Sequence, residues 1–182
     1  FQLSEKVSLF VEKMKIPFVS MQSGKASIDE SLDQFVGVYN GNNSDPSVLQ
    51  YVGNCDCFVL IGTLWDDLNT GAFSAKIPVE KKIEIGLHDI QIGHSQYNNC
   101  EFEDVVNGIL NFSQEEIGEK TGFQRKNDRK IYIEESNQNS PLSMIHFYSK
   151  IENFFEPNDI ILLEAGTTLA MSEFRFPKGC IC

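Results

Sequence analysis

The stretch that decides the fold is Phe58-Val59-Leu60-Ile61, an apolar run that ends at Gly62. The run is continuous rather than alternating, which is typical of a parallel strand buried on both faces. Small, polar and turn-forming residues follow it at positions 63–73. Open α/β sheets carry their functional loops at the carboxyl ends of their strands. We therefore expect a buried core strand here, and a site or the remains of one in the loop that follows it.

The composition is that of a folded, acidic protein. The chain has 182 residues, of which 41% are hydrophobic, and this is enough for one domain with residues to spare. A formal net charge of -11 repels polyanions, so we expect no binding to nucleic acid or to an anionic membrane. No apolar run reaches the roughly 20 residues of a membrane span, and we expect no targeting segment.

The five cysteines predict reduced thiols in a cytoplasmic protein. Cys55 and Cys57 stand two apart, as do Cys180 and Cys182, and residues two apart on a strand point the same way. No pair has the spacing of a redox or zinc motif, and His88, His94 and His146 are isolated. We expect the cysteines to act as small buried hydrophobes, and we expect no metal ligand.

Helical and strand patterns alternate along the chain. Ser4 can cap a helix whose apolar residues recur at three- and four-residue spacing, and Pro17 fits its end. Ser44 or Asp45 can cap a second helix with Pro46 at its first position. The order predicts helices that begin near residues 4, 46, 102 and 142, and strands at residues 16–21, 57–62, 82–85, 90–92 and 159–164.

Two glycine-containing loops could contact a phosphate. Residues 23–30 hold one cation, Lys25, but they lack Walker spacing, so a turn in which Gly24 supplies a positive φ competes with a phosphate cradle. Gly166-Thr167-Thr168 follows an expected strand and opens a helix. Glycine lets the backbone approach an anion, threonine hydroxyls donate to it, and a helix amino terminus attracts it. A capped helix start fits these three residues equally well.

A change in composition divides the chain into three parts. Residues 1–112 form the first domain, and residues 113–141 are polar, charged and poor in apolar residues, which marks a linker. Residues 142–182 begin a second domain.

Several of these stretches resemble the thiamine diphosphate dependent 2-oxoacid decarboxylases, the pyruvate and indolepyruvate decarboxylase group. The most specific is the Asp-hydrophobic-Asn-Thr-Gly-x-Phe block at residues 67–73, which lies at the expected distance from the others. The resemblance covers nearly the whole chain and less than half of the enzyme. In chain order, the stretches that carry it are Gly24-Lys25, Ser27-Ile28-Asp29-Glu30, Gly37-Val38-Tyr39, Pro46, residues 67–74, Gly166-Thr167-Thr168 and Phe176-Pro177.

The resemblance implies an α/β fold: a Rossmann-type parallel sheet flanked by helices, which is the central domain of thiamine diphosphate enzymes. Residues 142–182 would then be the truncated start of the diphosphate-binding domain. Relatives place one more strand ahead of the first helix, and we expect a neighbouring segment, or residues that this numbering omits, to fill its place. Some relatives hold FAD or ADP in this domain. The acidic Asp66 and Asp67 and the lack of a GxGxxG motif disfavour a dinucleotide, but a nucleotide-binding or regulatory module remains the alternative, beside an interaction domain without a ligand.

The resemblance also implies a function, the non-oxidative decarboxylation of a 2-oxoacid to an aldehyde and CO2 by a homo-oligomer, a dimer or tetramer, with thiamine diphosphate and Mg²⁺. Gly166 and Thr167 match the Gly-Thr that contacts the cofactor's diphosphate, and Thr168 matches the Ser beside it. Ala165 and Met171 depart from the family pattern, so the identity of the oxoacid stays open. The activating glutamate, the histidine pair and the magnesium segment would lie outside this chain. We therefore predict that the fragment alone is structural or regulatory, has no catalytic residue or metal ligand, and is inactive.

Overall fold

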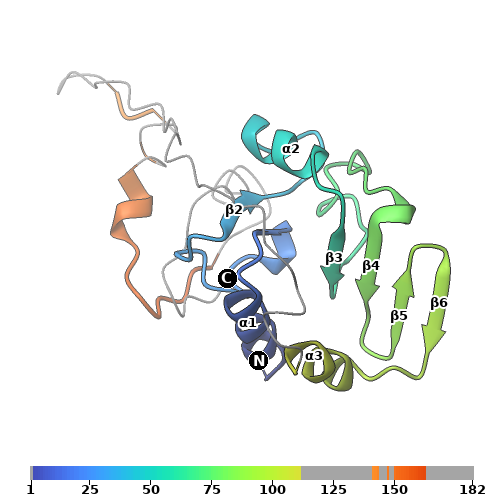
Figure 1. Cartoon of the computed structure of the whole chain (residues 1–182). Helices are drawn as coiled ribbons and strands as arrows, with labels where there is room; N and C mark the ends of the chain where they lie inside the picture. The colour runs from blue at the N-terminus through green and yellow to red at the C-terminus, as the bar shows by residue number, and fades with distance from the viewer. Residues whose placement is uncertain (1, 112–140, 144–146, 148–149, 163–182) are drawn as a thin grey trace.

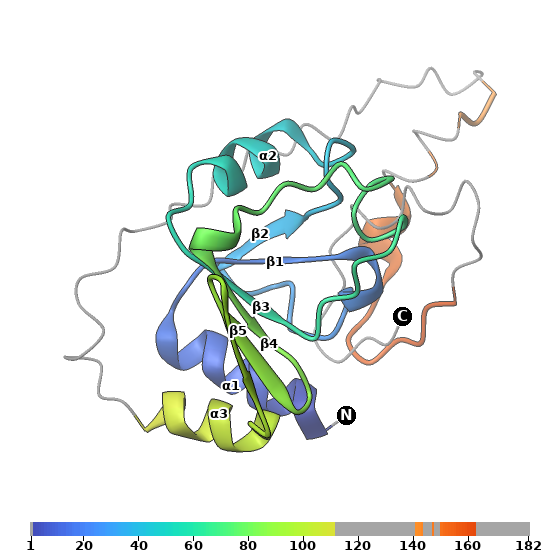
Figure 2. The same ribbon diagram turned by 90° about the vertical axis from the view of Figure 1, so that its right-hand side faces the viewer.

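The computed structural model describes residues 2–111, 141–143, 147 and 150–162 of the chain (Figure 1). Helices cover both faces of the strands: α2 lies on one side, and α1 and α3 lie on the other (Figure 2). The described elements are, in chain order, α1 (Gln2–Met14), β1 (Phe18–Ser20), η1 (Gln22–Gly24), β2 (Phe35–Val38), α2 (Pro46–Gly53), β3 (Phe58–Ile61), η2 (Val79–Lys81), β4 (Lys82–Ile85), β5 (Asp89–Ile92), β6 (Ser95–Asn98), α3 (Phe102–Leu110) and η4 (Glu152–Phe154).

The predicted helix starts follow from local chemistry. Pro46 occupies the first turn of α2, and the side chain of Asp45 accepts a hydrogen bond from the amide of Ser47 at 2.7 Å. This bond satisfies a backbone donor that a helix amino terminus leaves unpaired. The helix predicted near Ser4 is α1, and it ends at Met14, ahead of Pro17.

The strands form two sheets, each built on a parallel pair. β1 pairs with β2 in parallel, and β3 pairs with β4 in parallel. β5 and β6 extend the second sheet with antiparallel pairs. The connections from Ile85 to Asp89 and from Ile92 to Ser95 are too short for a parallel crossover, so these strands must run antiparallel. The prediction of an α/β domain with parallel strands between helices is confirmed.

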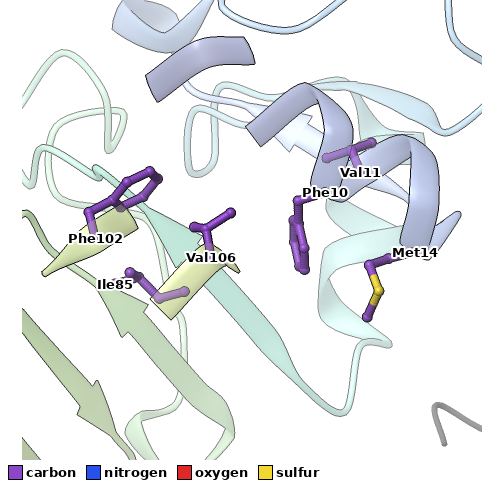
Figure 3. Packing of buried hydrophobic residues seen from close by; sticks show 6 residues of the cluster. All are labelled: Phe10, Val11, Met14, Ile85, Phe102 and Val106. Carbon is purple, nitrogen blue, oxygen red and sulfur yellow. The ribbon is translucent and has the colours of Figure 1, made fainter. Parts of the chain in front are cut away.

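The main apolar cluster joins α1, β4 and α3. It consists of Phe10, Val11, Met14, Ile85, Phe102 and Val106, each of which is at most 8% exposed (Figure 3). Each such side chain contributes roughly 1.5–3 kcal/mol by leaving water. A second cluster lies on the α2 side and contains Tyr39, Val48 and Val52.

β1 and β3 contribute to both clusters, although they do not pair with each other. Phe18 of β1 and Ile61 of β3 pack against the first cluster, and Val19 and Phe58 pack against the second. No described strand lies between β1 and β3. The expectation that a neighbouring segment fills a missing strand is therefore not met among the described residues, and the expectation that this numbering omits it stays a prediction.

Two expectations about buried strands are met only in part. Val59 of β3 is 37% exposed, because β3 is the outer strand of its sheet and has only β4 beside it. Residues 159–162 contain a single bridge residue, Ile160, and no strand among those described. Ile161 is 7% exposed, whereas Ile160 and Leu162 are 72% and 91% exposed, so this stretch buries one face and not both. Residues 163–164 lie outside the described residues.

Other expectations are met in part. Of the predicted helix at 142–155, residues 147, 150 and 151 are helical, and η4 follows them. Cys55, Cys57 and Cys100 are free thiols; Cys57 is exposed and the other two are half-buried, so the expectation of buried cysteines is met at none of these three. No described helix has the length and apolar character that a membrane crossing requires.

Candidate functional site

The residues predicted to contact a diphosphate, Gly166, Thr167 and Thr168, lie outside the described residues, as does the linker up to residue 140. The predicted domain boundaries therefore stay predictions. Within the part of the chain that the structure describes, no group of three or more His, Cys, Asp or Glu residues could hold a metal ion.

The loop after β3 meets the segments that follow β1 and β2, and the three lie on the same side of the molecule (Figure 2). The amide of Ser23, after β1, donates to the side-chain oxygen of Asn69 at 2.9 Å. The amide of Asn42, after β2, donates to the hydroxyl of Ser74 at 2.8 Å. The sequence pointed to the loop after β3, and the structure shows which residues of the other two segments it meets.

Asn69 and Thr70 are buried and bonded within the protein. Asn69 is 1% exposed, and its amide group donates to the carboxylate of Asp66 at 3.0 Å. The other oxygen of that carboxylate accepts from the backbone amide of Asn69 at 2.7 Å. Thr70 is 2% exposed, and its hydroxyl accepts from the amide of Phe73 at 3.0 Å. These polar groups stabilise the loop itself and are not presented to a ligand.

Gly71 lets two backbones touch. A Cβ at this position would lie 2.2 Å from the carbonyl oxygen of Asn40, and its φ of +57° is one that side chains rarely adopt. Gly41 has the same role on the facing loop, because its Cβ would lie 2.4 Å from the carbonyl oxygen of Thr70. The Asn-Thr-Gly sequence therefore serves close packing of one loop on another, and not the approach of a phosphate.

The cation of the first glycine loop is also used inside the protein. The ammonium of Lys25 lies 2.8 Å from a carboxylate oxygen of Glu30, and their side chains are 2% and 1% exposed. The other oxygen of Glu30 accepts from the amide of Ala26 at 3.2 Å. The phosphate-cradle interpretation is therefore wrong. A positive φ at Gly24 is wrong too, because Ala26 takes it instead, with φ of 61°.

A second set of contacts, which sequence reasoning missed, fastens the same loop to the sheet. The indole of Trp65 donates to Glu84 of β4 at 2.7 Å, and the ammonium of Lys82 lies 2.6 Å from the other oxygen of that carboxylate. The ammonium also lies 5.8 Å from the centre of a Trp65 ring, within the range of a cation–π contact. Lys82 and Glu84 alternate with Ile83 and Ile85, so the sequence predicts that the two charged residues share one face of the strand. It does not predict that Trp65 contacts them.

The thiol of Cys55 stands beside the amino end of β3. Burial raises the pKa of Cys55, and the negative charge of Asp56 raises it further. Burial also raises the pKa of the nearby Tyr51 hydroxyl, and the electrostatic effect of Cys55 raises it further. A raised pKa keeps the thiol protonated and unreactive at neutral pH.

Comparison with known proteins identifies the family. Residues 1–106 match the family described as thiamine pyrophosphate enzyme, central domain. The chain belongs to the thiamine pyrophosphate enzymes. Thiamine pyrophosphate is another name for thiamine diphosphate, so the resemblance seen in the motifs is confirmed.

Curated relatives of the chain include fungal proteins named pyruvate decarboxylase. The chain is 27% identical over 177 residues to the protein of Candida albicans, which covers 97% of this chain and 31% of the relative. It is 28% identical over 180 residues to the protein of Hanseniaspora uvarum, which covers 94% and 30%. It is 24% identical over 172 residues to isozyme 1 of Saccharomyces cerevisiae, which covers 93% and 30%. The chain thus spans about three tenths of their length.

The comparisons and the geometry of the loop at 66–74 agree on the nucleotide-binding alternative, because neither supports it. The family description and the names of these relatives give no support to the nucleotide-binding alternative. In this chain, the loop at 66–74 is a packed structural element whose polar groups bond to the protein. The described residues show no set of groups that fits a diphosphate, so we derive no contact with the cofactor from them.

Proposed function

We propose that this chain is the central domain and the opening of the diphosphate-binding domain of a 2-oxoacid decarboxylase that uses thiamine diphosphate and Mg²⁺. The observation that supports the proposal is the extent of the similarity. Relatives named pyruvate decarboxylase align with 97% and 94% of the chain, well past residue 106, where the central-domain match ends. The complete protein would convert a 2-oxoacid, pyruvate or indolepyruvate, to an aldehyde and CO2 in the cytoplasm.

The chemistry accounts for the need for a cofactor. Loss of CO2 from a 2-oxoacid leaves a carbanion that no ordinary side chain can delocalise, and the thiazolium of thiamine diphosphate supplies the electron sink when it is bound. In our proposal, the backbone at Gly166 approaches the diphosphate, and the hydroxyls of Thr167 and Thr168 donate to its oxygens. Mg²⁺ would be held by residues outside this chain.

The described part then has a structural or regulatory role. Its loops at the strand ends are closed by their own hydrogen bonds, and its buried cation, Lys25, is paired with Glu30. Such a domain can hold the catalytic parts in position and contribute to subunit contacts in a dimer or tetramer. We propose that it carries no catalytic group.

An assay of two preparations tests this function. We expect the full-length protein to release CO2 from pyruvate or indolepyruvate when thiamine diphosphate and Mg²⁺ are both present. We expect the 182-residue chain alone to release none under the same conditions. Turnover by the chain alone, or none by a folded full-length protein with either substrate, would contradict the proposal.

Matched variants test the proposed diphosphate contacts in the full-length protein. Thr167→Val removes one hydroxyl at nearly constant volume, and we expect the Kd for thiamine diphosphate to rise about tenfold, as for the loss of one hydrogen bond to a charged group. Thr168→Ser keeps its hydroxyl and should leave the Kd unchanged. Equal affinities of all three proteins would remove Thr167 from the site.

A further inference from the structure

The strand β6 is the outer strand of the second sheet among the described residues (Figure 1). All four of its side chains are exposed, and its pairing with β5 is regular. Native proteins protect such an edge with a lysine, a proline or a bulge, each of which blocks a further strand. β6 has none of these three, and only its short length limits further pairing. Its edge is therefore open to another strand.

The hydrogen bonds between β4 and β5 fix the direction of the backbone groups in the hairpin. The amide of Gly86 donates to the carbonyl of Asp89 at 2.9 Å, and the amide of Gly93 donates to the carbonyl of Lys82 at 2.8 Å. Backbone groups of successive residues in a strand point to opposite neighbours. Asp89, Gln91 and Gly93 therefore direct their backbone groups toward β4.

The same alternation assigns the free edge of β6. Ile90 directs its backbone groups toward β6, where it pairs with Tyr97. Gln96 and Asn98, on either side of Tyr97, therefore direct their backbone groups away from the sheet. The thiol of Cys100 lies 3.8 Å from the carbonyl oxygen of Asn98, and a carbonyl can accept a second hydrogen bond.

These outward groups are complementary to those of a second copy of β6. In an antiparallel pair with its twofold axis at Tyr97, Gln96 of each copy lies opposite Asn98 of the other. Each such pair exchanges two hydrogen bonds, so the two pairs make four. An axis at Gln96 or at Asn98 would pair one of these residues with the turn at 93–94 or with residue 100, which lie outside the strand. The backbone therefore favours one register.

The side chains of β6 also suit a second copy. Tyr97 is 51% exposed and lies in one row with Ile85 and Ile90, on the face that packs against α3. In this register the two Tyr97 rings face each other at a non-hydrogen-bonded position, where side chains come closest. β6 has no charged residue, and the neighbouring carboxylate of Asp89 accepts from the side chain of Gln96 at 3.2 Å. The acidic charge of the chain is therefore not concentrated at this edge.

We propose that β6 pairs with β6 of a second copy of the chain, antiparallel and centred on Tyr97, so that two four-stranded sheets join into one. This inference rests on the proposed function in taking the chain as part of a homo-oligomer. A strand of four residues makes a small contact. The pairing therefore adds to other contacts between the copies of the full-length protein.

Disulfide crosslinking of the full-length protein tests the register. Tyr97→Cys places two thiols at a non-hydrogen-bonded position, where Cα atoms lie about 4.5 Å apart and a disulfide can form. Ser95→Cys, on the same face of the same strand, is the matched control, because its two Cα atoms would lie roughly 14 Å apart. We expect copper phenanthroline in air to crosslink Tyr97→Cys at least tenfold faster than Ser95→Cys. Mass spectrometry should find residue 97 joined to residue 97 of the second copy.

A proline substitution tests the hydrogen bonds. Gln96→Pro removes an outward amide, which an edge strand tolerates when its other side is free, and Gln96→Ala removes the side chain alone. Pairing loses two hydrogen bonds in the proline variant, one from each copy. We expect the Kd between copies, measured by sedimentation of the full-length protein, to rise about tenfold for Gln96→Pro and to change less than about twofold for Gln96→Ala. Circular dichroism establishes that each variant is folded.

The outcomes separate this pairing from the proposed function. A monomeric full-length protein, equal crosslinking of the two cysteine variants, or equal Kd values for the proline and alanine variants would overturn the pairing. A crosslink from residue 97 to another segment would overturn it too, since a different part of the protein would then cover β6. Neither readout depends on turnover. A protein that crosslinks at residue 97 but releases no CO2 would fail the proposed function alone, and one that releases CO2 without the crosslink would fail the pairing alone.

Discussion

Replacing Gly71 by alanine tests how the loop after β3 is built. The added Cβ would lie 2.2 Å from the backbone oxygen of Asn40, and the φ of +57° would have to be kept by a residue that avoids it. The left-handed conformation costs alanine about 1–2 kcal/mol. The contact is with backbone, which cannot rotate away, and overpacking of this kind costs about 1–3 kcal/mol. We expect Gly71→Ala to lower the free energy of unfolding by about 2–5 kcal/mol.

Two other glycines separate these costs. Gly62 has a φ of +60° but no atom within 4 Å of its Cβ position, so Gly62→Ala should lose only the conformational part, about 1–2 kcal/mol. Gly53 has neither a positive φ nor a neighbour, so Gly53→Ala should change stability by less than about 1 kcal/mol or raise it. The difference in the free energy of unfolding between Gly71→Ala and Gly62→Ala measures the contact of Gly71 with Asn40.

Urea unfolding of the chain supplies the measurement. Trp65 is the only tryptophan and lies in the loop itself, so its fluorescence reports on the loop, and far-ultraviolet circular dichroism reports on the whole fold. Coincident transitions would show that the loop unfolds with the domain. If Gly71→Ala proved no less stable than Gly62→Ala, the close approach of the two loops would be refuted.

Three further sets of variants test the buried polar groups and the thiol. Lys25→Met leaves the Glu30 carboxylate buried without its ammonium, so we expect the free energy of unfolding in urea to fall by about 3–5 kcal/mol. The double variant Lys25→Met/Glu30→Gln should recover part of this loss. Equal losses in the single and the double variant would contradict a coupled pair. Asn69→Asp brings a second carboxylate against Asp66, and we expect the free energy of unfolding to fall by about 3 kcal/mol at pH 7. This loss should shrink as the pH falls, because the folded state then binds a proton between the two carboxylates. A loss independent of pH would argue against this contact. The pKa of Cys55 is raised above its usual 9.0, so the unfolded chain releases that proton first, and stability should fall as the pH rises past about 9. Cys55→Ala should lessen that fall, and identical alkaline profiles of the two proteins would count against the assignment.

The parts of the fold that local chemistry decides could be predicted from the sequence. Pro46 after Asp45 predicted the start of α2, and the apolar run at 58–61 predicted β3, because caps and strand runs depend on neighbouring residues. Burial was harder to predict, because it depends on which strand lies beside which. The exposure of Val59 follows from the outer position of β3, which no property of the run itself determines.

The candidate site shows the same division. The Asn-Thr-Gly loop could be located from the sequence, but its partners could not, because Ser23 and Asn40 are distant in the chain. The pairing of Lys25 with Glu30 was missed, since a lysine in a glycine loop is equally compatible with a phosphate or with a buried carboxylate. The positive φ of Ala26 depends on that buried carboxylate, which accepts its amide. The diphosphate contacts of Gly166 and Thr167 stay predictions.

The most direct measurement of the central claim is an experimental structure of the full-length protein with thiamine diphosphate and Mg²⁺ bound. We predict that the diphosphate lies within hydrogen-bond distance of Gly166 and Thr167, and that Asn69 and Gly71 keep their contacts with Ser23 and Asn40. A cofactor or nucleotide seated on the loop at 66–74, or a diphosphate remote from Gly166, would contradict the account.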